Sequence, residues 1–266
     1  GCSYISLCLC CAKKMLLPVK ENGEPDKSTK NIAISNSIGG YGQGLPECKE
    51  AVDTADYNVF RDIAPLAPDC AVMVKELYGD LVAEHLKEVR QSLFPEDEDR
   101  KYIAVQFKES FDVEYLPGIL DEVAKTTGCT IVFFAAGTAP GHDSFEVYKT
   151  VTEKMKEPAI VYEAENVWKT VAVISGAKAV LASSLHVRIM SFIYFKPRVT
   201  WCSLEKHGHF INLWDAPNMR VCGEVNTTWS ILSQYWGETP ATTQDETELH
   251  YKKVVSKYME SFEEWG

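Results

Sequence analysis

From residue 102 onward the sequence alternates short apolar runs with amphipathic segments, and this alternation constrains the fold more than any other feature. Five of the runs are continuously apolar and too short to be helices, so they indicate buried strands. We expect these strands at 102–107, 130–134, 159–162, 177–182 and 198–201. The segments between them predict helices at 115–125, 143–155, 167–175 and 186–194. Apolar strands alternating with helices are typical of a parallel sheet covered on both faces, which places this part in the α/β class.

The segment before residue 95 is less regular. Short strands are expected at 31–35 and 57–60, with a helix at 45–52 between them. The acidic stretch 95–99 has the composition of a solvated linker. We therefore expect a partial N-terminal Rossmann-like domain over 1–94 and a second Rossmann-like domain over 95–240. A C-terminal helix over 241–266 should pack back through a stripe of aromatic residues.

Composition narrows the possible partners. The net charge of -11 argues against a nucleic-acid partner, which requires a clustered positive surface. No apolar run approaches the ~18 residues that a spanning helix needs. Among the nine cysteines, Cys8 and Cys11 have C-x-x-C spacing, but no second pair and no nearby histidine completes a zinc site, so we expect reduced structural thiols, no metal and no cofactor. For the apolar, cysteine-rich segment 2–17 three interpretations stay open: a buried strand, a remnant of a signal segment, or an acylated tail.

The most informative segment for function is Ser183-Ser184-Leu185-His186-Val187-Arg188, which follows the predicted strand at 177–182. In parallel sheets, ligands bind beyond the carboxyl ends of the strands, near helix N-termini. Helix-end amides, the hydroxyls of Ser183 and Ser184 and the guanidinium of Arg188 together suit an anion. His186 can transfer protons near neutral pH. The alternative is structural, with His186 bound to a backbone carbonyl and Arg188 on a surface between domains.

This segment, continued to Val199, resembles the hallmark segment of the polysaccharide pyruvyl transferase family. The resemblance extends to Val59-Phe60-Arg61-Asp62 with the following Pro-Asp element, and to Asn36-Ser37-Ile38-Gly39-Gly40. It covers roughly residues 31–201, and the Leu185-His186 segment is its most specific part.

The resemblance implies two Rossmann-like domains that face each other, as in GT-B glycosyltransferases, with the first domain apparently truncated here. Two positions depart from the family pattern. Ser184 stands where many members have an arginine before Leu-His, and Lys108 stands where an arginine is often found. Arg188 is expected to restore the missing positive charge from one helical turn later.

The activity that the resemblance implies is transfer of a pyruvyl group from phosphoenolpyruvate to two hydroxyls of a saccharide acceptor, as a ketal. We assign proton transfer to His186. The donor's anionic groups are assigned to Arg61, Lys108 and Arg188, with Ser183 and Ser184 as further donor-binding residues.

Two other functions stay open: a GT-B glycosyltransferase that uses a nucleotide sugar, and a catalytically silent homologue that binds glycans. Either a cytoplasmic or a Golgi-lumenal location fits these activities. The sequon at Asn226 mildly favours the secretory pathway.

Overall fold

The computed structural model describes residues 32–36, 57–61, 66–139, 141–201, 205–219, 222–236 and 240–263. The chain divides into two compact units. One comprises residues 1–72 with 253–266, and the other comprises residues 73–252. Each unit has its own parallel sheet.

The smaller unit contains the short strands β1 (Ile32–Asn36), β2 (Tyr57–Arg61) and β3 (Leu66–Ala67) in the order β1-β2-β3. Two of these match the strands predicted at 31–35 and 57–60. The predicted helix at 45–52 and the segment 2–17 lie outside the described residues.

The larger unit is built on a six-stranded sheet with the order β6-β5-β4-β7-β8-β9, in which every pair is parallel. Its first five strands confirm the sequence prediction, because each lies within or matches a predicted range. They are β4 (Tyr102–Gln106), β5 (Thr130–Phe134), β6 (Ala159–Tyr162), β7 (Ala179–Ala182) and β8 (Arg198–Trp201). The short β9 (Cys222–Gly223) adds an edge that the sequence did not predict. The α/β class is confirmed, whereas the two-domain GT-B-like arrangement stays a prediction.

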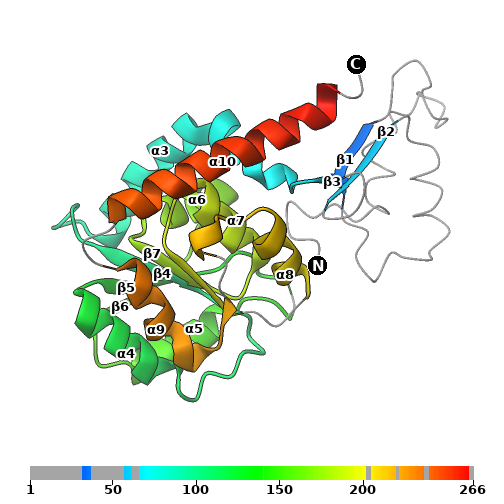
Figure 1. Ribbon diagram of the computed structural model, residues 1–266. Helices are drawn as coiled ribbons and strands as arrows, with labels where there is room; N and C mark the ends of the chain where they lie inside the picture. Colours follow the sequence, from blue (N-terminus) through cyan, green and yellow to red (C-terminus); the bar gives the residue numbers. More distant parts are fainter. Residues whose placement is uncertain are drawn as a thin grey trace, which may run out of the picture. The chain divides into compact units, whose positions relative to one another are not determined.

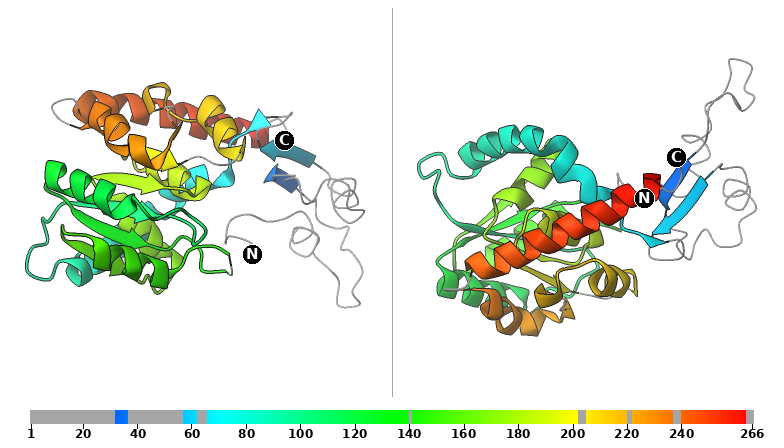
Figure 2. Two further views of the ribbon diagram at one scale, coloured as in Figure 1. Left: turned by 90° about the horizontal axis from the view of Figure 1, so that it is seen from below. Right: turned by 45° about the horizontal axis from the view of Figure 1, so that its top comes forward.

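Helices cover both faces of this sheet (Figures 1 and 2). One layer contains α4 (Leu116–Thr127), α5 (Phe145–Lys154) and α9 (Thr228–Leu232). The other contains α3 (Val74–Leu93), α6 (Val167–Gly176) and α7 (Leu185–Ile193). Right-handed crossovers produce these two layers, because the chain leaves β4 in one direction and returns to β7 on the other side. Helix α8 (Glu205–Leu213) follows β8.

Local residues explain where several helices begin and end. Ser144 and Asn166 cap α5 and α6, and their side-chain oxygens accept hydrogen bonds from the backbone N–H groups of Val147 and Lys169. Helix α4 ends at Gly128, whose φ of 67° lies in the left-handed region that glycine adopts without a steric penalty.

The domain boundary differs from the expectation. Helix α3 belongs to the larger unit, so the acidic stretch 95–99 is a loop inside that unit rather than a linker between units. The physical reason is packing. The Tyr78 ring of α3 contacts the Trp168 ring of α6 with 4.8 Å between centroids, and Arg90 donates a 3.2 Å hydrogen bond to the carbonyl of Gly176.

The C-terminal helix α10 (Pro240–Glu263) occupies most of the segment where a final helix was expected. Tyr251 on this helix packs against the rings of Phe192 and Phe195, and its hydroxyl donates to Glu76 at 3.0 Å. At Tyr251, the aromatic stripe therefore packs against the rings of Phe192 and Phe195.

The cysteines follow the prediction only in part. Cys70 and Cys129 are reduced, and burial raises the pKa of the Cys129 thiol. Cys222, by contrast, is disulfide-bonded, so the expectation of reduced thiols is wrong at that position. Among the described residues, no helix combines the length and apolar character that crossing a membrane requires.

Candidate functional site

The candidate site lies where the direction of strand addition reverses, between β4 and β7. From β4 the chain adds β5 and β6 on one side, and α6 then carries it back to β7 and β8 on the other side. The loops after β4 and β7 therefore lead to helices on opposite faces of the sheet, and a ligand-binding crevice is expected at the carboxyl ends of these two central strands. In the register of the pair, Gln106 at the end of β4 lies opposite Ala182 at the end of β7.

Gln106 ties the two strand ends together. Its backbone carbonyl accepts a 3.1 Å hydrogen bond from the N–H of Ser183. Its side-chain oxygen accepts a second bond, at 3.0 Å, from the N–H of Ser184. The side chain is only 1% exposed, so these bonds are shielded from water. Gln106 thereby fixes the turn that leads from β7 into α7.

Asp143 supports Gln106 from the loop before α5. One carboxylate oxygen accepts a 2.7 Å hydrogen bond from the Gln106 side-chain amide. The other accepts bonds from the N–H groups of Ala136 at 2.7 Å and Gly137 at 3.3 Å. Burial raises the pKa of the Asp143 carboxyl, and these hydrogen bonds oppose the shift without cancelling it. The carboxylate therefore connects the loop after β5 to the centre of the sheet.

Ser183 and Ser184 lead directly into α7. Ser183 is buried, and its hydroxyl oxygen has no hydrogen-bond partner within the described part of the chain. Ser184 occupies the N-cap position, but its side chain makes no capping bond. The first turn of α7 thus retains backbone N–H groups for a ligand, and an uncapped helix N-terminus favours an anion.

Gln106 connects the loop after β4, which contains Lys108, to the start of α7, which contains His186. Both side chains are partly buried. Lys108 is two residues beyond the end of β4, in a loop held to the loop before α5 by a 2.8 Å bond from the Glu109 N–H to the His142 carbonyl. His186 is the second residue of α7. The fold therefore brings the segments that carry Lys108, Ser183, Ser184 and His186 to one edge of the sheet.

Arg188 has a different environment. It is 1% exposed, and its guanidinium donates to Asp215 Oδ2 at 2.6 Å, to Thr200 Oγ1 at 2.7 Å and to the Met219 carbonyl at 2.6 Å. These bonds use N–H groups on all three guanidinium nitrogens. The expected role in donor binding has no support in this arrangement, because the guanidinium is directed into the core, and we assign Arg188 a structural role.

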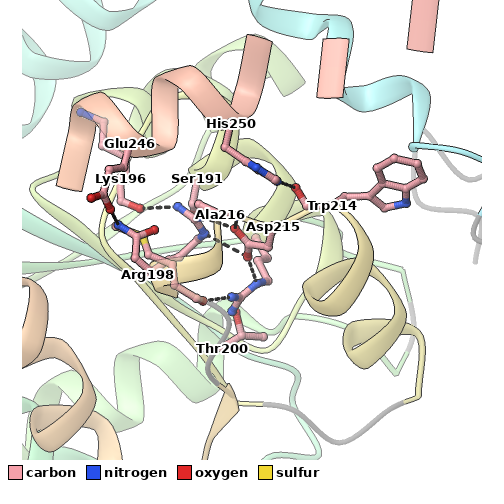
Figure 3. A network of polar contacts seen from close by, with 12 residues as sticks. Ser191, Lys196, Arg198, Thr200, Trp214, Asp215, Ala216, Glu246 and His250 are labelled. Atoms are coloured by element: carbon pink, nitrogen blue, oxygen red, sulfur yellow. Dashed lines mark hydrogen bonds and ion pairs between the residues drawn. The ribbon is translucent and has the colours of Figure 1, made fainter. Parts of the chain in front are cut away.

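Asp215 is the centre of this network (Figure 3). It is fully buried and also pairs with Arg198, which lies on one side of it and donates to both of its carboxylate oxygens. Burial alone would raise the pKa of the Asp215 carboxyl. The charges of Arg198 and Arg188 outweigh burial and hold that pKa below its usual value. The network joins α7 and β8 to the turn after α8, and so fixes the orientation of the helix that begins at the candidate site.

Arg61 belongs to the smaller unit, at the end of β2. Its side chain lies outside the described part of the structure, so its assignment to the donor's anionic groups stays a prediction.

Sequence reasoning identified the turns of this site but missed Gln106, Asp143 and Asp215. Gln106 lies within the strand predicted at 102–107, and a polar residue near the end of an otherwise apolar strand was the available signal. Asp215 stands alone between Trp214 and Ala216, and an isolated carboxylate among apolar neighbours indicates a buried ion pair.

The arrangement suits an anionic ligand. It brings a helix N-terminus, a buried serine hydroxyl and segments with a lysine and a histidine to one edge of the sheet. No group of three or more potential metal ligands occurs in the described ranges.

Comparisons with known proteins relate the chain to others by fold alone. No family model matches it, and no curated protein matches its sequence. Among solved structures, UDP-GlcNAc 2-epimerase from Neisseria meningitidis superimposes with a TM-score of 0.52 at 12% identity, over 77% of this chain and 55% of that one. The glycosyl transferase family 9 protein from Veillonella parvula gives a TM-score of 0.40 at 12% identity, over 70% of this chain and 52% of that one. The chain therefore spans about half the length of these two proteins, and it shares an α/β fold with the epimerase.

Proposed function

We propose that the chain is a transferase that acts on sugars and binds an anionic donor at the crevice between β4 and β7. The more specific proposal is that the donor is phosphoenolpyruvate and that the product is a pyruvyl ketal. The observation that carries the proposal is the bridge from Gln106 to Ser184, because it holds the Lys108 loop and the start of α7 at the same crevice.

The site residues suit this chemistry. The N-terminus of α7, the Ser183 hydroxyl and Lys108 are placed to hold the phosphate and the carboxylate of the donor. His186 then protonates the methylene carbon, and the adjacent carbon gains oxocarbenium character. A sugar hydroxyl oxygen bonds to that carbon, and the carbon–oxygen bond to phosphate breaks. The second hydroxyl closes the ketal. One of the two hydroxyl protons returns to His186, and the other leaves with phosphate.

The alternative donor is a nucleotide sugar. The similar epimerase was solved with UDP-GlcNAc bound, and a diphosphate would also suit the N-terminus of α7. This alternative requires no proton transfer to carbon.

Thermal stabilisation distinguishes the two donors. A ligand at ~100 times its Kd stabilises the folded state by ~2.7 kcal/mol. For a chain of this size that corresponds to a rise in Tm of roughly 5–11 °C. We expect this rise with phosphoenolpyruvate and none with UDP-GlcNAc; the reverse result favours the nucleotide-sugar donor. No response to either ligand contradicts both.

Turnover is then measured as phosphate release with phosphoenolpyruvate and simple galactosides. His186→Asn should reduce turnover ~10²–10⁴-fold and leave donor-induced stabilisation nearly unchanged, because asparagine cannot exchange a proton near neutral pH. The matched control is Lys125→Met, which changes an exposed side chain of α4. Near-normal turnover in His186→Asn refutes the mechanism. Donor binding without turnover in the wild type indicates a silent homologue.

A further inference from the structure

A row of lysines lies along the edge of the large sheet opposite the candidate site. Lys101, Lys178 and Lys196 stand just before the strands β4, β7 and β8, which are neighbours in the sheet. Val180 pairs with Arg198, so two residues earlier Lys178 is opposite Lys196 on the adjacent strand. Adjacent strands are ~4.8 Å apart, so the two lysines leave the backbone close together.

A cavity of about 580 Å³ opens at this edge. Lys101 and Lys178 line it together with Arg90 from α3, and Glu98 and Asp99 contribute its acidic side. Arg90 is held in place by hydrogen bonds to the carbonyls of Glu98 at 2.7 Å and Gly176 at 3.2 Å. Hydrogen bonds to the backbone therefore hold the Arg90 side chain in the cavity lining.

Lys196 interacts electrostatically with this cluster and is partly buried. Burial, followed by the charges of Lys178, Arg90 and Lys75, lowers the pKa of its amine to about 8. The charged groups that act most strongly on Lys196 are all cations. Within the described ranges, none of Lys101, Lys178 and Lys196 forms an ion pair, although the chain as a whole is acidic. The cavity lining has three cations against the two carboxylates Glu98 and Asp99, so positive charge is in excess there, and an anion would lower the repulsion between the cations.

Helix dipoles explain part of this arrangement. Lys178 follows the C-terminus of α6, where a positive charge is favourable. That effect is confined to the last turn, however, and it does not account for an open cavity or for the partly buried Lys196 with cations as its charged neighbours.

We propose that the cavity lined by Arg90, Lys101 and Lys178, with Lys196 beside it, is a second anion site that binds a phosphate group. A dianionic phosphate neutralises two of these cations. The cavity also leaves room for the organic part of a phosphate monoester, and its carboxylates Glu98 and Asp99 can accept hydrogen bonds from that part's hydroxyls.

Amine labelling followed by mass spectrometry tests the site directly, because each lysine is measured separately. Inorganic phosphate and glycerol 3-phosphate are added at constant ionic strength, with chloride and acetate as reference anions. We expect both phosphates to slow the labelling of Lys178 and Lys196 several-fold, and to leave Lys125 unaffected. Stronger protection by glycerol 3-phosphate identifies a monoester site, and stronger protection by inorganic phosphate identifies a site for the free ion.

Variants complete the test. Loss of one charge-assisted hydrogen bond costs ~1.5–3 kcal/mol, so Lys178→Met should weaken phosphate protection of Lys196 roughly 10–150-fold. Lys196→Arg keeps the charge and should retain protection of Lys178. The control Lys108→Met, at the other edge of the sheet, should leave protection of Lys196 intact. Equal protection by chloride, or full protection of Lys196 in Lys178→Met, overturns the proposal. Loss of protection in Lys108→Met would place the phosphate at the donor site instead.

Discussion

Replacing Arg188 by methionine tests whether this arginine serves the fold or the donor. Methionine keeps an unbranched side chain of similar length but removes every guanidinium donor. In the structure, those donors go to Asp215, Thr200 and the Met219 carbonyl, all buried. The substitution therefore leaves two buried acceptors without their donor and Asp215 with one arginine instead of two.

The expected magnitude follows from these contacts. Removing one partner of a buried ion pair costs ~3–5 kcal/mol. Because Arg198 still neutralises Asp215, we expect Arg188→Met to lie near the lower limit, at about 3 kcal/mol. Asp215→Asn should cost more, at about 5 kcal/mol, because it leaves two guanidinium groups buried together without a counterion. At ~2–4 °C per kcal/mol, Arg188→Met should lower Tm by roughly 6–12 °C.

Chemical denaturation and thermal unfolding measure both variants. The matched control is Arg100→Met, which removes an exposed arginine with a single 3.2 Å bond to Thr130 and should cost about 1 kcal/mol or less. Donor-induced stabilisation by phosphoenolpyruvate is recorded on the same samples. A variant that melts within ~2 °C of the wild type, below 1 kcal/mol, yet no longer responds to the donor would refute the structural assignment of Arg188.

Two further predictions concern the candidate site. Ser183→Ala removes a buried hydroxyl that has no partner in the described structure, so it should leave stability unchanged or raise it by up to ~1 kcal/mol. The same variant should bind phosphoenolpyruvate several-fold more weakly, and a clear loss of stability with normal binding would contradict the assignment. Asp143→Asn tests the pKa of Asp143, which lies above its ordinary 3.8 in the folded chain. The folded state keeps this proton at pH values where the unfolded chain has already lost it. The free energy of unfolding of the wild type, relative to that of Asp143→Asn, should therefore fall as pH rises from about 4 toward neutrality. A difference between the two proteins that is constant across this range, measured by urea denaturation, would show that the carboxyl is not perturbed.

The sequence was sufficient for the large sheet because its strands are buried on both faces. Runs such as Thr130–Phe134 are continuously apolar, so their boundaries follow from composition alone. Helix α3 was not predicted, although apolar residues such as Leu77, Leu81 and Leu86 recur along it at helical spacing; only Val82, Val89 and Leu93 are buried on it. Its place in the larger unit depends on contacts with α6, and those become visible only in three dimensions.

The candidate site was predictable in position but not in detail. Parallel strand order places Ser183 and His186 at the carboxyl edge of the sheet, and that inference needs no side-chain coordinates. Arg188 could not be assigned in the same way. Arg188 is two residues beyond His186 on the same helix, so its side chain points in a different direction. Its partner Asp215 is 27 residues away in the sequence.

The pairing of β4 with β7 has a consequence for folding. The hydrogen bond from Ser184 to Gln106 joins residues 78 positions apart, whereas β4 and β5 are joined by a single helical crossover. Contacts of such long sequence separation form late, because the intervening chain must be ordered before they are made. Residues 102–162 can therefore form their three strands while the anion-binding turn is still open, and the crevice is completed only when α6 has brought β7 into place. During synthesis, ligand binding should first appear after residue 219, the last partner in the network that fixes the orientation of α7, has left the ribosome.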